Sequence, residues 1–238
     1  MVLWAVERAL AARHVSRAIV ATDDQRIFEA VTSAGFEAMM TRSDHASGTD
    51  RVAEVAQVFP EAQIIVNVQG DEPLISPETI DRAIEALMAP GSESVKMATT
   101  CEAITDLADV IDSAVVKVVM DENGRALYFS RSPIPYPNEA VRRHGSVRAA
   151  LENEPELLSS FRKHTGLYVY RREFLLQYST WPQSPLELTE SLEQLRAIER
   201  GVTIKVVEAA APSIGVDTID DFERVRAMLE REPITAAI

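Results

Sequence analysis

The chain has 238 residues, of which 46% are hydrophobic and 26% are charged, a composition typical of a globular domain. Its formal net charge of -13 excludes a general binder of nucleic acids or anionic membranes, because such proteins carry a basic surface. The lone Cys101 excludes an intrachain disulfide, and no apolar run is long enough to span a membrane. We therefore expect a cytoplasmic protein of one domain, residues 1–238, with no nucleic-acid partner and no membrane insertion.

The first sixty residues alternate between helix and strand patterns. Short apolar or β-branched runs are each followed by a segment with helical periodicity. The expected elements are helix 2–12, strand 17–22, helix 25–34, strand 37–41 and helix 51–58. This alternation is typical of right-handed βαβ units, so the sequence predicts an α/β fold with a mixed, mostly parallel sheet flanked by helices.

A polar segment, expected as a loop, precedes the helix at residue 51. It ends in Ser47, Gly48, Thr49, Asp50 and Arg51. Ser, Thr and Asp are common N-cap residues, so helix capping is one explanation. A loop with many small donors and acceptors beside a glycine also suits the polar edge of a nucleobase, and the residues alone leave both explanations open.

The stretch from Ile64 to Pro73 combines a strand with an acidic turn. Its first half is an unbroken apolar run, as in strands that are buried on both faces. Gly70 and Pro73 then end the strand around Asp71 and Glu72. Ligands of open α/β sheets bind outside the carboxyl ends of strands, which makes Asp71 a candidate metal ligand. The alternative is a turn whose carboxylates only face water.

The middle of the chain adds a helix and a hairpin. Ser76 and Pro77 are typical N-cap and N1 residues, and Asn123-Gly124 is the strongest hairpin signal in the chain. The expected elements are helix 76–88, strand 96–100, a helical or irregular segment 106–111, and strands 114–120 and 126–130. Lys117 is either a solvated strand residue or a cation near phosphate. Arg131 begins a stiff loop with three prolines and can present a fixed fork to a carboxylate or phosphate.

The remaining residues return to the α/β pattern. The expected elements are a helix-permissive segment 138–161, strand 163–170, helix 186–200, strand 203–208 and helix 219–231. His164 is explained most simply as a half-buried histidine with a hydrogen-bond partner. Asp217 is either a strand-end carboxylate or the cap of the last helix. If the strand ends that carry Asp71 and Asp217 are neighbours, the two carboxylates suit Mg²⁺ bound together with substrate phosphates.

Other nucleotide-binding and hydrolase motifs are missing. The sequence has no G-x-G-x-x-G after a strand, no G-x-x-x-x-G-K-[ST], no H-E-x-x-H and no G-x-S-x-G. Seven segments instead occur in an order that closely resembles the 3-deoxy-manno-octulosonate cytidylyltransferase (CMP-Kdo synthetase) family. They lie at residues 47–51, 66–73, 116–119, 126–131, 163–170, 192–196 and 216–218.

This resemblance implies an α/β nucleotidyltransferase (GT-A-like) fold and a Mg²⁺-dependent reaction. The substrates would be CTP and Kdo (3-deoxy-manno-octulosonate), and the products CMP-Kdo, for lipopolysaccharide synthesis, and pyrophosphate. Residues 112–185 would form a small lobe around the hairpin, on the sugar side and at a homodimer interface.

The resemblance also assigns roles to individual residues. Asp71 and Asp217 match the metal positions, and Ser47, Gly48, Thr49, Asp50, Arg51 and Gln69 match positions that face the cytidine. Arg131, His164, Tyr168, Glu193 and Gln194 match positions around the sugar, where Arg131 would bind the Kdo carboxylate. The resemblance thus predicts that catalysis depends on Asp71, Asp217 and Arg131.

One part of the family pattern is missing. Family members begin with a strand and a triphosphate-binding loop resembling I-P-A-R-x-x-S-x-R-x-P-G-K-P-L, whereas this sequence starts inside the helix that follows. We therefore expect that this start is a truncation of the real protein, which leaves a gap in the sheet. If this chain is all there is, we expect weak CTP binding and little turnover. Two alternatives stay open: an inert homologue that serves as a binding or partner module, and a CMP-sugar synthetase for 8-amino-Kdo or a sialic acid.

Overall fold

The computed structural model describes residues 1–216 and 218–231, and the chain divides into two compact units. Unit 1 comprises Met1–Glu61, Asn67–Asp81 and the chain from Ala210 onward, and unit 2 comprises Ala62–Val66 and Arg82–Ala209. The lobe expected over residues 112–185 falls wholly within unit 2. No helix of the described ranges is long and apolar enough to cross a membrane.

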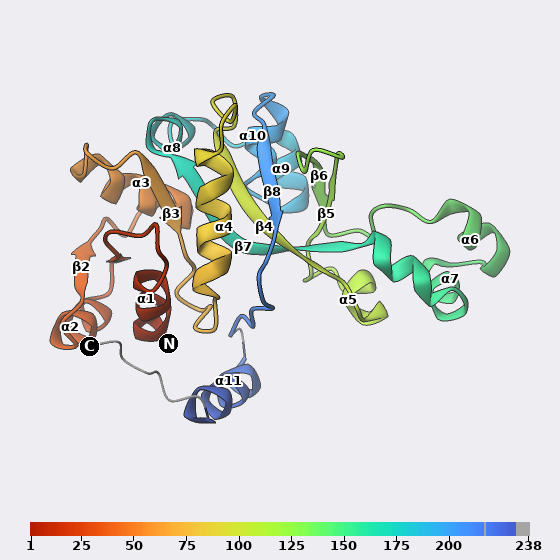
Figure 1. The fold of residues 1–238 in the computed structure, drawn as a ribbon, viewed down its shortest axis with the longest axis horizontal. Coiled ribbons are helices and arrows are strands. Elements are labelled where there is room, and N and C mark those ends of the chain that lie inside the picture. Colours follow the sequence, from red (N-terminus) through yellow and green to blue (C-terminus); the bar gives the residue numbers. More distant parts are fainter. Residues whose placement is uncertain (217, 232–238) are drawn as a thin grey trace. The chain divides into compact units, whose positions relative to one another are not determined.

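Unit 1 contains the alternating elements that open the chain (Figure 1). They are α1 (Val2–Leu10), β1 (Ile19–Thr22), α2 (Gln25–Ser33), β2 (Glu37–Met40) and α3 (Gly48–Val58), with α11 (Ile219–Arg231) added from the C-terminal part. β1 and β2 pair in parallel as a two-stranded sheet, with Ile19 opposite Glu37. The Asp24 carboxylate caps α2 by accepting a hydrogen bond of 2.8 Å from the N–H of Arg26. The predicted strand–helix alternation is confirmed here.

Unit 2 is built on a six-stranded sheet of order β6-β5-β7-β4-β8, in which β3 also pairs with β7. The strands are β3 (Ile64–Asn67), β4 (Met97–Ala103), β5 (Lys117–Met120), β6 (Ala126–Ser130), β7 (Arg162–Arg171) and β8 (Ile204–Glu208). β4 and β8 are parallel, whereas β7 runs antiparallel to both β4 and β5. The predicted mixed α/β class is confirmed, with more antiparallel pairing than the mostly parallel sheet expected, because the hairpin and β7 return the chain in the opposite direction.

The predicted hairpin joins β5 to β6, and its turn explains the Asn-Gly pair. The Asp121 carboxylate accepts hydrogen bonds of 2.8 Å from the N–H groups of Asn123 and Arg125. Gly124 has φ +68°, and a Cβ there would lie 3.1 Å from the carbonyl oxygen of Val206. Glycine is therefore required both by the backbone conformation and by the close approach of β8.

The helices of unit 2 are mostly short. They are α5 (Leu107–Ile111), α6 (Asn138–His144), α7 (Val147–Asn153), the 3₁₀ helix η1 (Pro155–Ser160), α8 (Arg172–Tyr178), α9 (Pro185–Glu190) and α10 (Leu195–Glu199). The helix α4 (Pro77–Met88) begins in unit 1, as Ser76 and Pro77 predict, and continues into unit 2. Ile104, Val110, Leu151 and Phe161 form a small buried core, to which α5 contributes Val110 and α7 contributes Leu151.

The prediction of one helix over residues 186–200 is wrong. The chain forms α9 and α10 instead, separated at Ser191, which has the left-handed backbone conformation φ 54°, ψ 48°. A residue in this conformation ends a helix, so the periodicity of Leu188, Leu192 and Leu195 reflects two short helices with apolar residues rather than one continuous face. The break places Glu193 and Gln194 in the connection between the helices.

Candidate functional site

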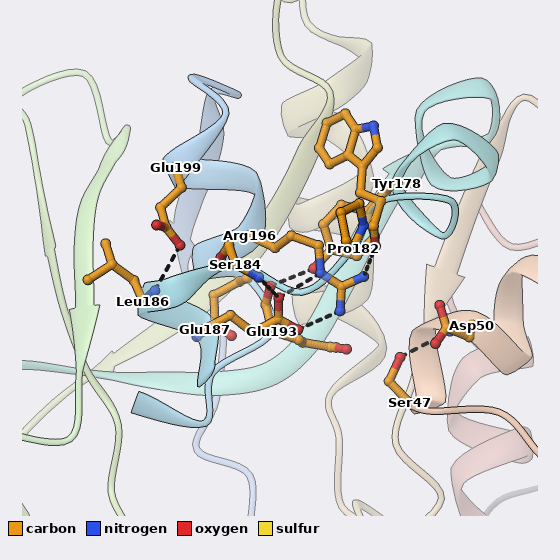
Figure 2. Close-up of polar contacts among 12 residues, drawn as sticks. Ser47, Asp50, Tyr178, Pro182, Ser184, Leu186, Glu187, Glu193, Arg196 and Glu199 are labelled. Carbon is orange, nitrogen blue, oxygen red and sulfur yellow. Dashed lines mark hydrogen bonds and ion pairs between the residues drawn. The ribbon is translucent and has the colours of Figure 1, made fainter. Parts of the chain in front are cut away.

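The polar segment before residue 51 is a loop up to Ser47, as expected, but its last residues already belong to a helix, which corrects the loop expected there. α3 begins at Gly48, so Thr49 and Asp50 lie in its first turn and Thr49 is fully buried. The Ser47 hydroxyl accepts a hydrogen bond of 3.2 Å from the N–H of Asp50 (Figure 2). This cap satisfies one of the free N–H groups of the first turn and lets the helix begin three residues earlier than the apolar pattern predicts.

We expect Ser47→Ala to lower the free energy of unfolding by about 1 kcal/mol, because it removes this cap. Ser47→Asn is the matched control, since Asn caps as well as Ser does. Urea unfolding of the two variants measures the difference. Equal stability of the Ala and Asn variants would contradict a capping role.

Arg51 and Glu54 anchor the start of α3 to the strands and the preceding loop. A terminal nitrogen of Arg51 lies 2.6 Å from the Thr41 hydroxyl and 3.1 Å from the Asp23 carboxylate, so α3 is tied to the ends of β2 and β1. The Glu54 carboxylate contacts Nε2 of His45 and accepts a hydrogen bond from the N–H of Arg42. The hydrogen bond with His45 lowers the pKa of Glu54. No local pattern singles out Glu54, because its partners lie outside its own helix.

Asp71 lies in the exposed turn after β3, where the strand-end argument placed it. Its carboxylate has no hydrogen bond or ion pair with any described residue, and its main-chain carbonyl accepts a hydrogen bond of 2.9 Å from the N–H of Val216. Val216 precedes Asp217, which itself lies outside the described residues. Half-buried Gln69 belongs to the same turn. The backbone contact thus brings the segments that carry the two candidate ligands together.

The described residues contain no cluster of three or more His, Cys, Asp or Glu side chains able to hold a metal. An exposed carboxylate such as that of Asp71 still fits Mg²⁺, because this ion keeps most of its coordination for water and substrate phosphates and takes only one or two protein carboxylates. The donor chemistry is therefore compatible with a magnesium ion that arrives with a nucleotide.

In unit 2, Arg131 is held by neutral acceptors. Its guanidinium donates to the carbonyl oxygens of Glu190, Ser113 and Ser191, at 2.8, 3.0 and 3.4 Å. The Glu190 carboxylate instead accepts from the Ser130 hydroxyl at 2.7 Å and from the main-chain N–H of Arg131 at 3.0 Å. Within the described ranges the Arg131 guanidinium makes no ion pair, and three carbonyl oxygens fix its orientation. An oriented, unpaired guanidinium is suited to an anionic ligand.

Of the two predictions for Lys117, a solvated strand residue or a cation near phosphate, the first is wrong. Its side chain is fully buried, and Nζ donates to the carbonyl oxygens of Asp112 and Val115 at 2.7 and 2.6 Å. Burial lowers the pKa of Lys117. Lys117 thus holds the segment that also supplies Ser113, one of the acceptors of Arg131, and whether phosphate lies near it stays a prediction.

β7 carries the next two candidate residues, and they contact the α9–α10 connection and the neighbouring strand. Nε2 of His164 lies 2.8 Å from the Thr99 hydroxyl, which confirms a half-buried histidine with a partner. The Tyr168 hydroxyl donates to Oε1 of Gln194 at 3.0 Å. Gln194 is buried, and its Nε2 has no hydrogen-bond partner among the described residues. The Glu193 carbonyl accepts from the Tyr178 hydroxyl at 2.5 Å, so this connection is tied to α8.

A buried ion pair that the sequence did not reveal supports this connection. The Arg196 guanidinium binds the Glu187 carboxylate at 2.7 and 2.5 Å, and the two side chains are 5% and 4% exposed. Figure 2 shows the pair joining α9 to α10, beside Tyr178. Nine residues separate the partners, which is not a spacing of neighbours on one helix, so only the break at Ser191 makes the contact possible.

The predicted site residues therefore fall into two groups. Unit 1 holds Ser47, Gly48, Thr49, Asp50 and Arg51 at the start of α3, and Gln69 and Asp71 after β3. Unit 2 holds Arg131 beside α9, and His164, Tyr168, Glu193 and Gln194 on β7 and the α9–α10 connection. Each group offers a different chemistry: small polar groups and carboxylate in unit 1, and a cation with neutral donors and acceptors in unit 2.

Comparison with known proteins gives consistent matches. A family model described as cytidylyltransferase matches residues 1–204. The 3-deoxy-manno-octulosonate cytidylyltransferase of Trichlorobacter lovleyi is 47% identical over 97% of this chain and 88% of its own length. The enzyme of the same name from Geobacter sulfurreducens is 48% identical over 97% and 89%.

Solved structures agree. A CMP:2-keto-3-deoxy-manno-octonic acid synthetase complexed with CTP has a TM-score of 0.84 and 41% identity, covering 97% of this chain and 88% of its own. A 4-diphosphocytidyl-2C-methyl-D-erythritol synthase from Anaerococcus prevotii, 14% identical over 97% of this chain and 89% of its own, shares the fold alone, with a TM-score of 0.57.

Proposed function

Because the chain belongs to the 3-deoxy-manno-octulosonate cytidylyltransferases of the cytidylyltransferase family, we propose that it transfers CMP from CTP to Kdo and releases pyrophosphate. The observation that carries this proposal is the likeness, over nearly the whole chain, to a synthetase solved with CTP. In the reaction the anomeric hydroxyl oxygen of Kdo bonds to the α-phosphorus of CTP. The bond between the α-phosphorus and the bridging oxygen breaks, and the hydroxyl proton is lost.

The nucleotide end of the reaction is assigned to unit 1. Ser47 to Arg51 and Gln69 are proposed to face the cytidine, with α3 fixed by Arg51 so that its polar first turn keeps one orientation. Asp71 and Asp217 are proposed to hold Mg²⁺, which when bound neutralises charge on the triphosphate. The Asp71 carboxylate makes no hydrogen bond or ion pair with the part of the chain that the structure describes, and its carbonyl accepts a hydrogen bond from the N–H of Val216; both observations support this assignment.

The sugar end is assigned to unit 2. Arg131 is proposed to bind the Kdo carboxylate, because its fork is held by neutral carbonyls and its charge has no partner among the described residues. His164, Tyr168, Glu193 and Gln194 are proposed to contact the sugar hydroxyls. The Nε2 of buried Gln194, which has no partner within residues 1–216 and 218–231, supports this assignment, since a buried donor without an acceptor is costly until a ligand supplies one.

We further propose that CMP-Kdo made by this chain serves lipopolysaccharide synthesis in the cytoplasm, and that the chain acts as a homodimer through the lobe of residues 112–185. The absence of a membrane-spanning helix among the described residues is compatible with this setting. Sedimentation equilibrium would test the dimer, and a monomer at micromolar concentration would contradict it.

A pyrophosphate-release assay tests the reaction. With Mg²⁺, we expect CTP and Kdo to give stoichiometric pyrophosphate and CMP-Kdo. ATP, GTP and UTP should give at least about fivefold lower kcat/KM, since each lost hydrogen-bond match costs about 1 kcal/mol or more. 8-Amino-Kdo and a sialic acid are tested in parallel. If either sugar gives a higher kcat/KM than Kdo, that sugar replaces Kdo as the proposed substrate. No turnover with any of these sugars would contradict the proposed activity.

A further inference from the structure

Thr99 lies within the unit 2 sheet, next to two of the proposed sugar residues, His164 and Tyr168. It belongs to β4, is fully buried, and pairs across the antiparallel ladder with Tyr168 of β7. Its hydroxyl oxygen lies 2.8 Å from Nε2 of His164, 2.7 Å from the carbonyl oxygen of Leu167 and 3.5 Å from that of Thr165. No role has been assigned to this residue so far.

The Thr99 hydroxyl has only one proton to donate, and this decides which nitrogen of His164 carries a proton. A carbonyl oxygen only accepts, so the contact of 2.7 Å with Leu167 requires the single hydroxyl proton of Thr99. The hydroxyl then has only lone pairs for His164 and must accept a hydrogen bond from Nε2–H. A neutral imidazole with Nε2–H has an unprotonated Nδ1, which is an acceptor.

The surroundings of His164 keep the imidazole neutral. The ring of Phe129 lies edge-on to it at 5.1 Å, and that of Tyr168 lies at 5.3 Å. No carboxylate among the described residues forms an ion pair with it. Burial lowers the pKa of His164 to about 3, so the ring does not gain a proton near neutral pH.

We propose that Thr99 is a positioning residue for the sugar: it fixes His164 as the Nε2–H tautomer and so makes Nδ1 an acceptor for a substrate hydroxyl. Gln194 accepts from the Tyr168 hydroxyl through Oε1, and its Nε2, which has no partner among the described residues, is a donor. An acceptor and a donor around one aromatic ring are the complement of sugar hydroxyls, which both donate and accept. The inference rests on the proposed function in that the ligand is a polyhydroxylated sugar acid.

The tautomer can be measured without substrate or turnover. Long-range ¹H–¹⁵N spectra of the unaltered chain at pH 7 should show His164 with a protonated Nε2 and a pyridine-like Nδ1. The His164→Asn variant identifies its signals among the four histidines of the sequence. Thr99→Ser keeps the hydroxyl and should keep the spectrum, whereas Thr99→Val, which has the same shape without the hydroxyl, should lose the preference for Nε2–H.

Sugar binding supplies the second measurement. Thr99→Val removes one fixed hydrogen bond and should raise both the KM and the dissociation constant for Kdo about tenfold. The KM for CTP should not change. In Thr99→Ser, the constants for Kdo should stay near those of the unaltered chain. An Nδ1–H or protonated His164 in the unaltered chain would overturn the inference, whether or not Kdo binds. Kdo affinity equal in the Val and Ser variants would also overturn it. If the tautomer is as stated but the unaltered chain binds no Kdo, the proposed function fails instead.

Discussion

Asp71→Asn should lower the rate of pyrophosphate release from CTP at least about 10³-fold, because a metal ligand supports several kcal/mol of transition-state charge stabilisation and about 1.36 kcal/mol is a factor of ten. The side chain is exposed and free of ion pairs in the described structure, so its carboxylate has no structural partner to lose. The hydrogen bond from Val216 reaches the main-chain carbonyl, which asparagine keeps. We therefore expect the loss of activity without a change in stability.

Glu61→Gln is the matched control. Glu61, like Asp71, is an exposed carboxylate near β3, but it lies before the strand and Asp71 lies after it. It should leave the rate within about twofold, as expected of a surface change that touches no ligand. Electron paramagnetic resonance of Mn²⁺ in the presence of CTP provides a readout that does not need turnover. If the Asp71→Asn variant binds Mn²⁺–CTP as tightly as the unaltered chain, Asp71 is not a metal ligand.

The sequence predicted those helices, strands and turns that are determined by residues close together in the chain. The Asn-Gly turn, Ser76 before Pro77, and the apolar run from Ile64 each correspond to an observed hairpin, helix start or strand. The start of α3 was misplaced by three residues because capping by Ser47 extends the helix beyond its apolar pattern. The break at Ser191 escaped prediction because serine seldom adopts positive φ, and here Arg196 and Glu187 hold the helices on either side.

The candidate site shows the same division. Asp71 was identified from its place after an apolar strand that was expected to be buried on both faces. In the structure Ile64, Ile65 and Val66 of this strand are only half-buried, but Asp71 does follow it. Val216, just before the second predicted ligand, contacts Asp71. The stiff proline loop singled out Arg131 as a candidate anion ligand, and the resemblance then named the Kdo carboxylate. The role of Gln194 came only from the family resemblance, since nothing in its neighbourhood along the chain signals a ligand. Thr99 and Glu54 were not found at all, because their partners lie on other strands or loops and only the folded chain brings them together.

Breaking the buried pair between Arg196 and Glu187 should cause the largest loss of stability. Arg196→Met leaves the Glu187 carboxylate buried without a counter-charge, with the N–H of Ser184, at 3.0 Å, and the side chain of Gln183 as neutral donors. This should lower the free energy of unfolding by about 3–5 kcal/mol. Met also removes the cation from its place 4.9 Å from the centre of the Tyr178 ring. Because the pair joins α9 to α10, the variant should also weaken Kdo binding at the connection between them.

Two controls separate charge from packing in this prediction. Arg142→Met breaks an exposed pair with Glu139, whose side chains are 70% and 73% exposed, and should cost no more than about 0.5 kcal/mol. The double variant Arg196→Met with Glu187→Leu removes both charges and should recover much of the lost stability, because an apolar pair of similar volume replaces a buried ion pair at little cost. A double variant less stable than Arg196→Met would show that packing, and not the unpaired carboxylate, is responsible.

The pH dependence of this loss follows from the pKa of Glu187. Burial acts to raise it, but hydrogen bonds from Arg196 and Ser184 outweigh burial, so the pKa lies below its ordinary value. When the pKa of a carboxyl is lower in the folded chain than in the unfolded chain, the carboxyl stabilises the fold. This contribution is complete above the pKa in the unfolded chain, about 4.3, and is lost as the pH falls through the pKa in the folded chain. In Arg196→Met the unpaired carboxyl takes up a proton more readily in acid, which relieves its burial. The difference in unfolding free energy between the unaltered chain and Arg196→Met, measured with urea, should therefore be largest at about pH 7. It should shrink as the pH falls toward about 4.3, because the variant's carboxyl takes up its proton, and shrink further below about 4.3, because the unaltered chain loses the contribution of its ion pair. A difference that does not change with pH would contradict the role of charge.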